Sequence, residues 1–188
     1  MYKVNKILIV DLDDTLIYTS PFKKKLFLKL SQESGLSYSR IKGIYSICKE
    51  KDYKDLYYRF SRSIYDVSKM DSKKFGDILF SEIRKLRIKR KVLNYVRNFK
   101  GYRLLLTLGD RKIQKAKIDY LEDKIKLYGL FDKVKIISTD KFSYLKSLLK
   151  GRSLWFEEKK FNKVFILDDR GSVFEGLRKF SWIKILNP

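Results

Sequence analysis

Apolar residues follow two different spacings along this chain. Residues 7–10 form an uncharged, β-branched-rich run, which is typical of a strand buried on both faces of a parallel sheet. From residue 17 to about 90, apolar residues instead recur at intervals of three and four, which predicts consecutive helices. The first predicted helix has Ser20 as its N-cap and Pro21 in its first turn, and it ends at Gly35. The second begins near Ser37, and the fourth covers about 72–86. The residues of the third helix that are predicted to face inward are Tyr53, Leu56, Tyr57, Phe60 and Ile64.

From about residue 92, short apolar runs alternate with helix-like segments. The expected strands are 102–106, 134–137, 164–167 and 183–186, and the expected helices are 92–99, 113–121 (followed by a break at Gly129), one opened by Lys141 with Leu145, Leu148 and Leu149 inward, and 173–177. Strands that alternate with helices pair in parallel through right-handed crossovers. We therefore predict an α/β fold with a Rossmann-like, doubly wound parallel sheet. Residues 1–16 and 91–188 would form this core, and residues 17–90 an inserted α-helical domain.

Composition narrows the classes of protein and of chemistry. The chain has 188 residues, 44% of them apolar, so it can bury a substantial core. Its apolar runs are shorter than the roughly 18–20 residues of a membrane span, and the run at 7–10 leads directly into acidic residues, unlike a signal peptide. We expect a cytoplasmic protein in which the single cysteine, Cys48, is a buried apolar residue. Histidine is absent, which excludes Ser-His-Asp triads and His-ligated zinc.

Positive charge is the strongest compositional bias. With 44 Lys and Arg against 22 Asp and Glu, the net charge is +22, which would attract phosphate esters, nucleotides or nucleic acid. A Lys-rich composition also accompanies high growth temperature or host bias, and that explanation remains open. The run 84–91 holds six bases and is either a solvated helix face or a basic rim beside a cleft. Aromatic and basic residues in the third predicted helix would fit base stacking and phosphate contact, although core packing explains the tyrosines equally well: Tyr57, Tyr58, Arg59 and Arg62.

Acidic residues gather where the first predicted strand ends. The run 7–10 leads into Asp11-Leu12-Asp13-Asp14-Thr15, at the position where open α/β sheets bind ligands. Carboxylates this close together need a cation or a shared proton. Mg²⁺ fits because it prefers hard oxygen ligands and phosphate oxygens. An Asp-rich surface loop is the alternative interpretation of these five residues.

The pattern Asp11-x-Asp13-x-Thr15 resembles the first motif of the haloacid dehalogenase-like (HAD) phosphohydrolases. Thr107 is similar to the Ser/Thr of the second motif, Lys141 to the base of the third, and Asp168-Asp169 to the acidic fourth motif. The resemblance spans essentially the whole chain. It implies a HAD-like core, with residues 17–90 as a helical C1-type cap. No proline follows Lys141 and no further acid lies four or five residues after Asp169, so the third and fourth motifs depart from the usual pattern.

The resemblance also implies a role for each site residue. Asp11 would be the nucleophile that forms an aspartyl phosphate, and Asp13 the general acid and base. The Thr107 hydroxyl, the amides of Leu108 and Gly109, and the Lys141 ammonium would bind the phosphoryl group. The ligands of Mg²⁺ would be Asp11, the backbone carbonyl of Asp13, Asp169 and Asp168. Lys112, Lys115 and Lys117 are rivals of Lys141 by position but follow the second motif too closely.

The expected function is a Mg²⁺-dependent phosphatase that acts on a small phosphorylated metabolite, a nucleotide or a nucleic-acid end. Because the dehalogenase branch of the family lacks the second aspartate, Asp13 favours a phosphoryl substrate over a haloacid. The alternative is a basic nucleic-acid-binding or regulatory protein on the same scaffold, with weak or lost catalysis.

Overall fold

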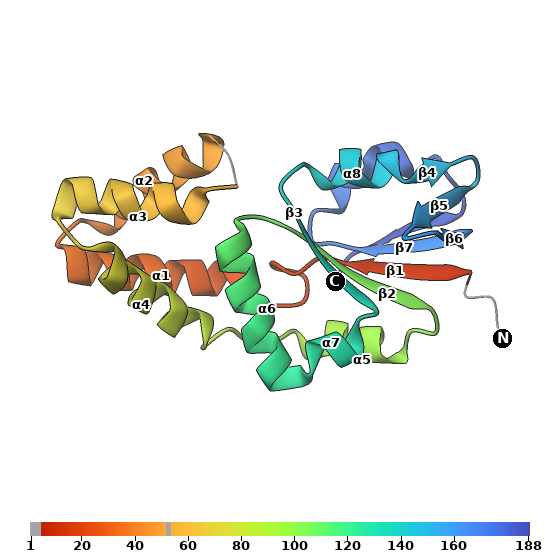
Figure 1. Cartoon of the computed structure of the whole chain (residues 1–188), viewed down its shortest axis with the longest axis horizontal. Helices are drawn as coiled ribbons and strands as arrows, with labels where there is room; N and C mark the ends of the chain where they lie inside the picture. Colours follow the sequence, from red (N-terminus) through yellow and green to blue (C-terminus); the bar gives the residue numbers. More distant parts are fainter. Residues whose placement is uncertain (1–4, 52–53) are drawn as a thin grey trace.

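A five-stranded parallel sheet forms the centre of the structure, a computed structural model that describes residues 5–51 and 54–188 (Figure 1). In spatial order its strands are β3 (Lys133–Ile137), β2 (Tyr102–Leu108), β1 (Lys6–Val10), β7 (Lys163–Leu167) and β8 (Ile183–Leu186). The first strand of the chain is therefore central, with β2 and β7 as neighbours in parallel register. This confirms the predicted α/β class with a doubly wound parallel sheet.

The two faces of the sheet are covered by different elements, as the alternation along β1 shows. Leu8 and Val10 belong to the apolar cluster that includes α5 (Arg90–Asn98) and α6 (Arg111–Ile125). Ile7 and Ile9 face the opposite side and belong to the second cluster, which includes residues of α8 (Lys141–Ser147) and the 3₁₀ helix η1 (Gly171–Leu177). All four side chains are buried, which explains the uncharged character of this strand.

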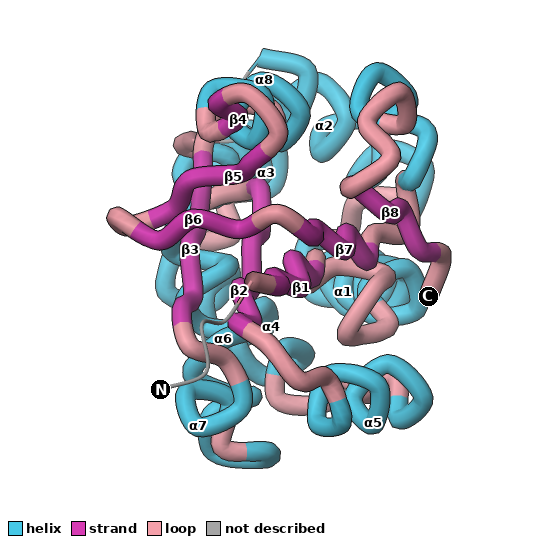
Figure 2. Tube along the Cα trace, turned by 90° about the vertical axis from the view of Figure 1, so that its right-hand side faces the viewer, coloured by secondary structure: helices cyan, strands magenta, loops and turns pink. Residues whose placement is uncertain are grey.

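A small antiparallel sheet lies beside the second face and differs from the prediction. Its strands are β4 (Leu149–Lys150), β5 (Ser153–Phe156) and β6 (Lys159–Phe161) (Figure 2). Leu149, expected on the inner face of a helix, lies in β4 instead. The turn between β5 and β6 consists of Glu157 and Glu158, both with positive φ. Such tight hairpins normally use Asn or Gly, so the sequence carried no turn signal here.

In the described residues, four helices form between β1 and α5, as predicted, and Figure 1 shows them extending from one end of the sheet. They are α1 (Thr19–Ser34), α2 (Tyr38–Lys51), α3 (Leu56–Ser68) and α4 (Ser72–Ile83). Of the residues predicted to face inward in the third helix, Leu56, Phe60 and Ile64 are buried and Tyr57 is half-buried, and Cys48 of α2 is buried as well. Tyr53, assigned to the third stripe, lies outside the described residues. The first helix begins at Thr19, before the predicted cap Ser20, because the Asp14 carboxylate accepts hydrogen bonds from both their amides at 2.8 Å.

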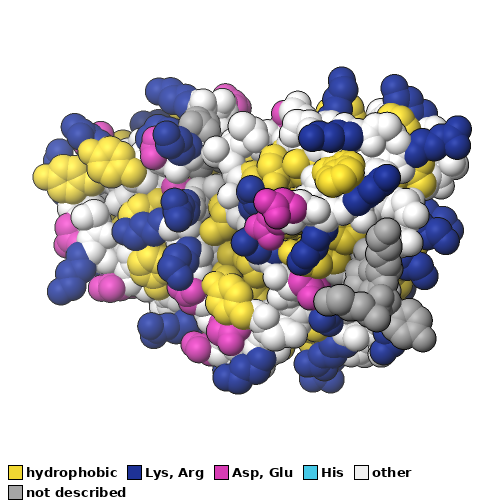
Figure 3. Space-filling model, turned by 45° about the vertical axis from the view of Figure 1, so that its right-hand side comes forward, with side chains coloured by type: hydrophobic (Ala, Val, Ile, Leu, Met, Phe, Trp, Pro, Cys, Tyr) yellow, Lys and Arg dark blue, Asp and Glu magenta, His cyan; other side chains and the backbone are white. Residues whose placement is uncertain are grey.

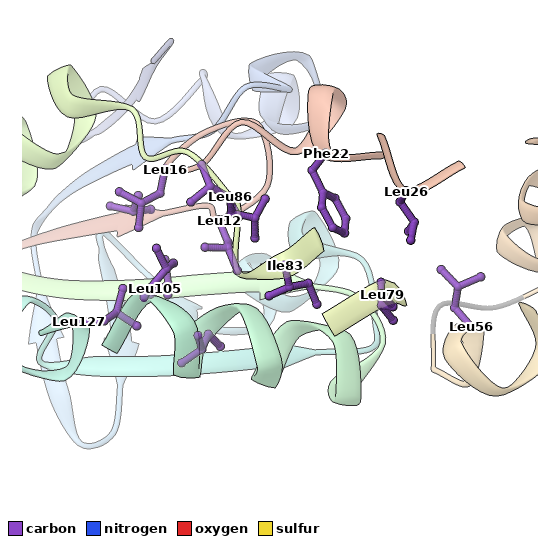
Figure 4. Packing of buried hydrophobic residues seen from close by; sticks show 14 of the residues in the cluster. Leu12, Leu16, Phe22, Leu26, Leu56, Leu79, Ile83, Leu86, Leu105 and Leu127 are labelled. Atoms are coloured by element: carbon purple, nitrogen blue, oxygen red, sulfur yellow. The ribbon is translucent and has the colours of Figure 1, made fainter. Parts of the chain in front are cut away.

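The segments that enter and leave these helices run side by side. The Tyr18 amide donates to the Arg87 carbonyl, and the Lys89 amide donates to the Leu16 carbonyl, both at 2.9 Å. The basic run 84–91 lies mainly in this connection, because α4 ends at Ile83 rather than near residue 86. Leu12, Leu16, Leu86 and Leu105 come from both the connections and the sheet and pack in one apolar cluster (Figure 4). The proposed boundaries at 16/17 and 90/91 stay a prediction.

One further helix boundary differs from the prediction. The chain turns at Lys126, which has a φ of 55°, and not at Gly129, which lies inside the short helix α7 (Leu127–Leu130). The 3₁₀ helix η1 takes the place of the predicted 173–177 helix. Among the described helices, none combines the length and apolar character that a bilayer crossing requires.

The small antiparallel sheet provides a test of the second apolar cluster. Phe161 in β6 is 1% exposed, whereas Trp155 in the adjacent strand is 38% exposed. We expect Phe161→Ala to lower the free energy of unfolding by about 3–5 kcal/mol, because a buried ring leaves a cavity. Trp155→Ala, the control, should cost about 1 kcal/mol or less. Urea denaturation measures both, and equal losses would contradict this packing.

Candidate active site

Three side chains from distant parts of the sequence meet at the carboxyl end of the central strands. Asp11 directly follows β1 and Asp168 directly follows β7, and the Asp11 amide donates to the Leu167 carbonyl at 2.9 Å. Lys141, the first residue of α8, donates from its ammonium to the Asp11 carboxylate and, at 2.7 Å, to Asp168 Oδ2. All three side chains are buried. The structure thus brings together the predicted nucleophile and the predicted residues of the third and fourth motifs.

Asp169 completes an acidic cluster with Asp11 and Asp168. One carboxylate oxygen from each residue lies within 4.8 Å of the others. Thr15 ties Asp169 to the loop after β1, because its hydroxyl accepts from the Asp169 amide at 2.8 Å. Asp168 uses both oxygens, one for Lys141 and one for the Arg170 amide at 2.9 Å. Asp11 and Asp169, within the described residues, each keep an oxygen with no hydrogen-bond partner.

The electrostatics of this cluster favour a bound cation. Burial raises the pKa of the Asp11 carboxyl to about 7; Lys141 opposes this rise, whereas Asp168 and Asp13 reinforce it. Burial and the charge of Asp168 also raise the pKa of Asp169. Two neighbouring carboxyls that resist ionisation become readily ionised beside a divalent cation. The atoms of this cluster that could coordinate a metal ion are all carboxylate oxygens, the ligands that Mg²⁺ prefers.

The Asp13 side chain turns away from the cluster and has its own partners. Its carboxylate accepts from the Thr19 hydroxyl at 2.6 Å, from Gln114 Nε2 at 2.7 Å and from the Lys117 ammonium at 2.6 Å. Burial alone would raise its pKa, but Lys117 and these hydrogen bonds lower the pKa to about 2. Asp11 and Asp13 thus have opposite pKa shifts although one residue separates them. The carboxylate of Asp13 is outside the acidic cluster, so only its backbone carbonyl remains as the predicted metal ligand.

The predicted phosphate-binding segment lies at the end of β2 and differs in detail from the expectation. The Thr107 hydroxyl is buried and accepts from Gln114 Nε2 at 3.1 Å. The Gly109 amide donates to the Ile137 carbonyl at 3.3 Å, because the pairing of β2 with β3 continues to this residue. A side chain at Gly109 would place its Cβ 2.7 Å from Gln114 Nε2. Glycine therefore permits the close approach of Gln114 to the strand end.

Gln114 and Lys117 are the site residues that sequence reasoning missed. Helix α6 begins after Asp110, whose Oδ1 accepts from the amides of the first turn. One face of this helix is buried and carries Gln114, Lys117, Ile118 and Leu121. Two polar residues on an otherwise apolar stripe were the available signal. Lys117, set aside as a rival of Lys141, binds Asp13 rather than Asp11.

The remaining residues that were considered for phosphate or base contact have other partners. Lys112 lies 3.9 Å from the centre of the Tyr57 ring, and Lys115 pairs with Asp119 on the surface. The Tyr57 ring packs edge-on against a buried phenylalanine ring, which favours the core-packing explanation for this residue. Arg59 donates to the Cys48 carbonyl at 3.2 Å.

Surface charge shows no single basic patch on the visible face. Lys and Arg side chains are spread over both the helical part and the sheet part in Figure 3. Tyr58 is 62% exposed and accepts a hydrogen bond from Arg62 at 3.2 Å, so this pair is available on the surface of α3.

A cavity of about 230 Å³ lies next to the acidic cluster. The part of its wall near the strand ends includes Asp11, Asp13, Asp169, Leu108 and Gly109. Its opposite part is built from apolar side chains of α1–α4, of which Figure 4 shows Phe22, Leu26, Leu56 and Leu79. Thr107, Lys141 and Asp168 are not part of the wall and support it from behind.

Comparisons with known proteins place this arrangement in context. No protein-family model matches the chain, and no curated protein matches it. A haloacid dehalogenase-like hydrolase from Burkholderia xenovorans LB400 superposes with a TM-score of 0.74 at 17% identity, over 98% of this chain and 82% of that chain. The HAD-hydrolase YfnB from Bacillus subtilis, bound to magnesium, gives 0.59 at 12% identity over 97% and 88%. The L-2-haloacid dehalogenase from Xanthobacter autotrophicus gives 0.59 at 14% identity over 98% and 76%.

The raised pKa of Asp11 predicts that the site destabilises the metal-free protein. The Asp11 carboxyl has a pKa of 3.8 in the unfolded chain and about 7 in the folded protein. The folded protein therefore loses stability as the pH rises between these two values. We expect Asp11→Asn to raise the melting temperature by about 3–6 °C at pH 8, and by less at pH 5. Differential scanning calorimetry with EDTA measures this shift. An unchanged or lower melting temperature at pH 8 would contradict the prediction.

The Asp13–Lys117 pair predicts a stability effect of the opposite sign. Because the folded pKa of Asp13 is about 2 and its unfolded value 3.8, the pair stabilises the fold above pH 3.8, and this stability is lost as the pH falls through 2. Lys117→Met should cost about 3–5 kcal/mol at pH 7 and raise the Asp13 pKa, measured by denaturation and carboxyl ¹³C NMR. Lys115→Met on the same helix is the control and should have a much smaller effect. Equal losses in the two variants would argue against a stabilising Asp13–Lys117 pair.

Proposed function

The chain has the haloacid dehalogenase-like fold, and we propose that it is a Mg²⁺-dependent phosphatase that works through an aspartyl-phosphate intermediate. The observation that carries the proposal is the buried Lys141 ammonium between Asp11 and Asp168, with Asp169 close by. This arrangement provides a carboxylate nucleophile, a fixed positive charge for a phosphoryl group, and oxygen donors for a metal ion. The fold alone would be compatible with other chemistry.

In the proposed first step, an Asp11 oxygen attacks the phosphorus of the ester. The new Asp11–phosphorus bond forms as the bond to the leaving oxygen breaks, and Lys141 offsets the charge on the equatorial oxygens. Asp13 gives its proton to the leaving oxygen. In the second step, Asp13 takes a proton from the water that hydrolyses the aspartyl phosphate, which returns Asp11 and releases inorganic phosphate.

Gln114, Thr19 and Lys117 would hold Asp13 in place for both steps. The three hydrogen bonds fix its carboxylate, and Lys117 keeps it ionised before substrate binds. A bound phosphate dianion acts in the other direction and raises the proton affinity of Asp13. This group therefore suits the role of base in the second step directly, and that of acid once the substrate is present.

Mg²⁺ would be held by Asp11 and Asp169, each of which has a carboxylate oxygen to spare, together with the Asp13 carbonyl. Bound there, it would neutralise charge on the nucleophile and on the transferred group. Asp168, the fourth predicted ligand, would act mainly by positioning Lys141, because both its oxygens accept hydrogen bonds. The magnesium bound to the similarly folded YfnB is consistent with this assignment.

Two other functions compete with this one. The similarly folded L-2-haloacid dehalogenase illustrates a different reaction on this scaffold, but Asp13 provides the acid and base that phosphoryl transfer to water requires. A nucleic-acid-binding protein with little catalysis would account for the net charge of +22 and for the exposed Tyr58–Arg62 pair.

Turnover of p-nitrophenyl phosphate separates these functions. We expect activity with Mg²⁺ that EDTA abolishes, and a loss of about 10³-fold or more in kcat/KM for Asp11→Asn or Lys141→Met. Asp119→Asn, an exposed carboxylate on α6, is the control and should retain activity. Salt-sensitive binding of DNA or RNA without turnover of any phosphate ester would overturn the proposal.

A further inference from the structure

We infer that the substrate is a small phosphate monoester whose leaving group has a flat apolar body and a second anionic group, which binds Lys23. This inference rests on the proposed function and adds the class of substrate. It follows from three features of the cavity beside the acidic cluster: an aromatic part of its wall, a small volume, and a lysine with no ion-pair partner among the described residues.

Part of the cavity wall is aromatic. Phe27, Tyr45, Phe60 and Phe75 come from four different helices, α1, α2, α3 and α4, and all line the cavity. Adjacent ring centroids are 5.1 Å apart for Phe27 and Tyr45, 5.4 Å for Tyr45 and Phe60, and 5.2 Å for Phe60 and Phe75. Rings at this spacing provide edges and faces that pack well against another flat, apolar group.

The size of the cavity favours a small molecule over a polymer. Its volume of about 230 Å³ lies below the common range for ligand pockets, about 300–1,000 Å³. The helical part also contacts the segment that follows β2, where the Tyr57 amide donates to Asp110 Oδ2 at 2.9 Å. A nucleotide at the end of a nucleic acid would need an open path for the rest of the strand. The small volume of the cavity therefore disfavours such an end as substrate.

Lys23 is the residue that would bind the anionic group of the leaving group. It lies in the first turns of α1, lines the cavity and is partly buried, whereas Lys24 and Lys25 on the same helix are exposed. Among residues 5–51 and 54–188, no carboxylate forms an ion pair with Lys23. Burial lowers the pKa of this ammonium, and the charges of Lys117 and Lys49, which also line the cavity, act in the same direction, while Asp13 and Asp14 oppose them.

An ammonium held in a partly apolar cavity is costly unless an anion meets it. Lys117 already has Asp13 as its partner, so it does not need an anion from the substrate. The phosphoryl group of the substrate would lie at Asp11, with the Lys141 ammonium behind this carboxylate. A second anionic group on the leaving group would form an ion pair with Lys23. The protein would then bind such a substrate better than an aromatic phosphate whose leaving group is neutral.

Two substrates that differ by one carboxylate test this inference. We expect wild-type protein to hydrolyse 4-carboxyphenyl phosphate with a kcat/KM about 10-fold above that for phenyl phosphate, mainly through a lower KM. Lys23→Gln should remove this preference, and Lys25→Gln, the matched control on the exposed side of α1, should keep it. Absence of the preference in wild-type protein, or its persistence in Lys23→Gln, would overturn the role of Lys23.

Two further comparisons separate failure of the inference from failure of the proposed function. If glycerol 3-phosphate or a 5′-phosphorylated oligonucleotide is hydrolysed better than phenyl phosphate, the phosphatase stands and the apolar small substrate is wrong. Calorimetric titration with 4-carboxybenzylphosphonate, which cannot be hydrolysed, reports on the cavity without turnover. Binding that Lys23→Gln weakens and Lys25→Gln preserves would support the inference even if no ester is hydrolysed. No binding by wild-type protein would overturn it.

Discussion

The contact of one lysine with two aspartates organises the whole site. Lys141 opens α8, Asp11 ends β1 and Asp168 ends β7, so this buried cluster joins the central strands to a helix on one face of the sheet. Taking these charges out of water is costly, and only their mutual contacts offset the cost. Burial raises the pKa of Asp11, and the single Lys141 ammonium does not offset this burial together with the neighbouring charges of Asp168 and Asp13. The imbalance is what suits the site to a divalent cation and a phosphoryl group.

Two aspartates in one motif acquire different chemistry from their surroundings. Asp11 lies at the tip of a buried strand with other carboxylates nearby, whereas Asp13 has three hydrogen-bond donors, among them Lys117. Pairs of acids whose environments push their pKa values apart are common in enzymes that need a nucleophile and a proton carrier together. Helix α6 provides two of the three donors to Asp13, so it belongs to the site as much as the strands do.

Helices α1 to α4, between β1 and α5, provide the apolar part of the cavity wall. Their entry and exit segments are hydrogen-bonded to each other, which fixes where the bundle meets the sheet. Asp110 caps α6 with one oxygen and binds the Tyr57 amide of α3 with the other. The helices whose aromatic side chains line the cavity are thereby fixed against the segment that follows β2. Selectivity and chemistry would then lie on separate parts of the chain that share one small cavity.

The sequence by itself determined the class of fold and the residues at the strand ends. The uncharged run before Asp11 and the alternation of strands and helices after residue 92 were enough to predict them. Burial of both faces of the sheet imposes a strong local pattern of apolar residues. Lys141, Asp168 and Asp169 were found because each follows such a run or opens a helix. The small antiparallel sheet was missed because its strands have two to four residues and its tight turn is Glu157-Glu158.

Only the tertiary structure decided which side chains are partners. Gln114 and Lys117 reach Asp13 across about a hundred residues of sequence, whereas Lys23, which lines the same cavity, forms no ion pair with a carboxylate of the described segments. Local spacing predicts which face of a helix is buried. It does not predict what that face meets, because this depends on how helices and strands from distant segments pack together.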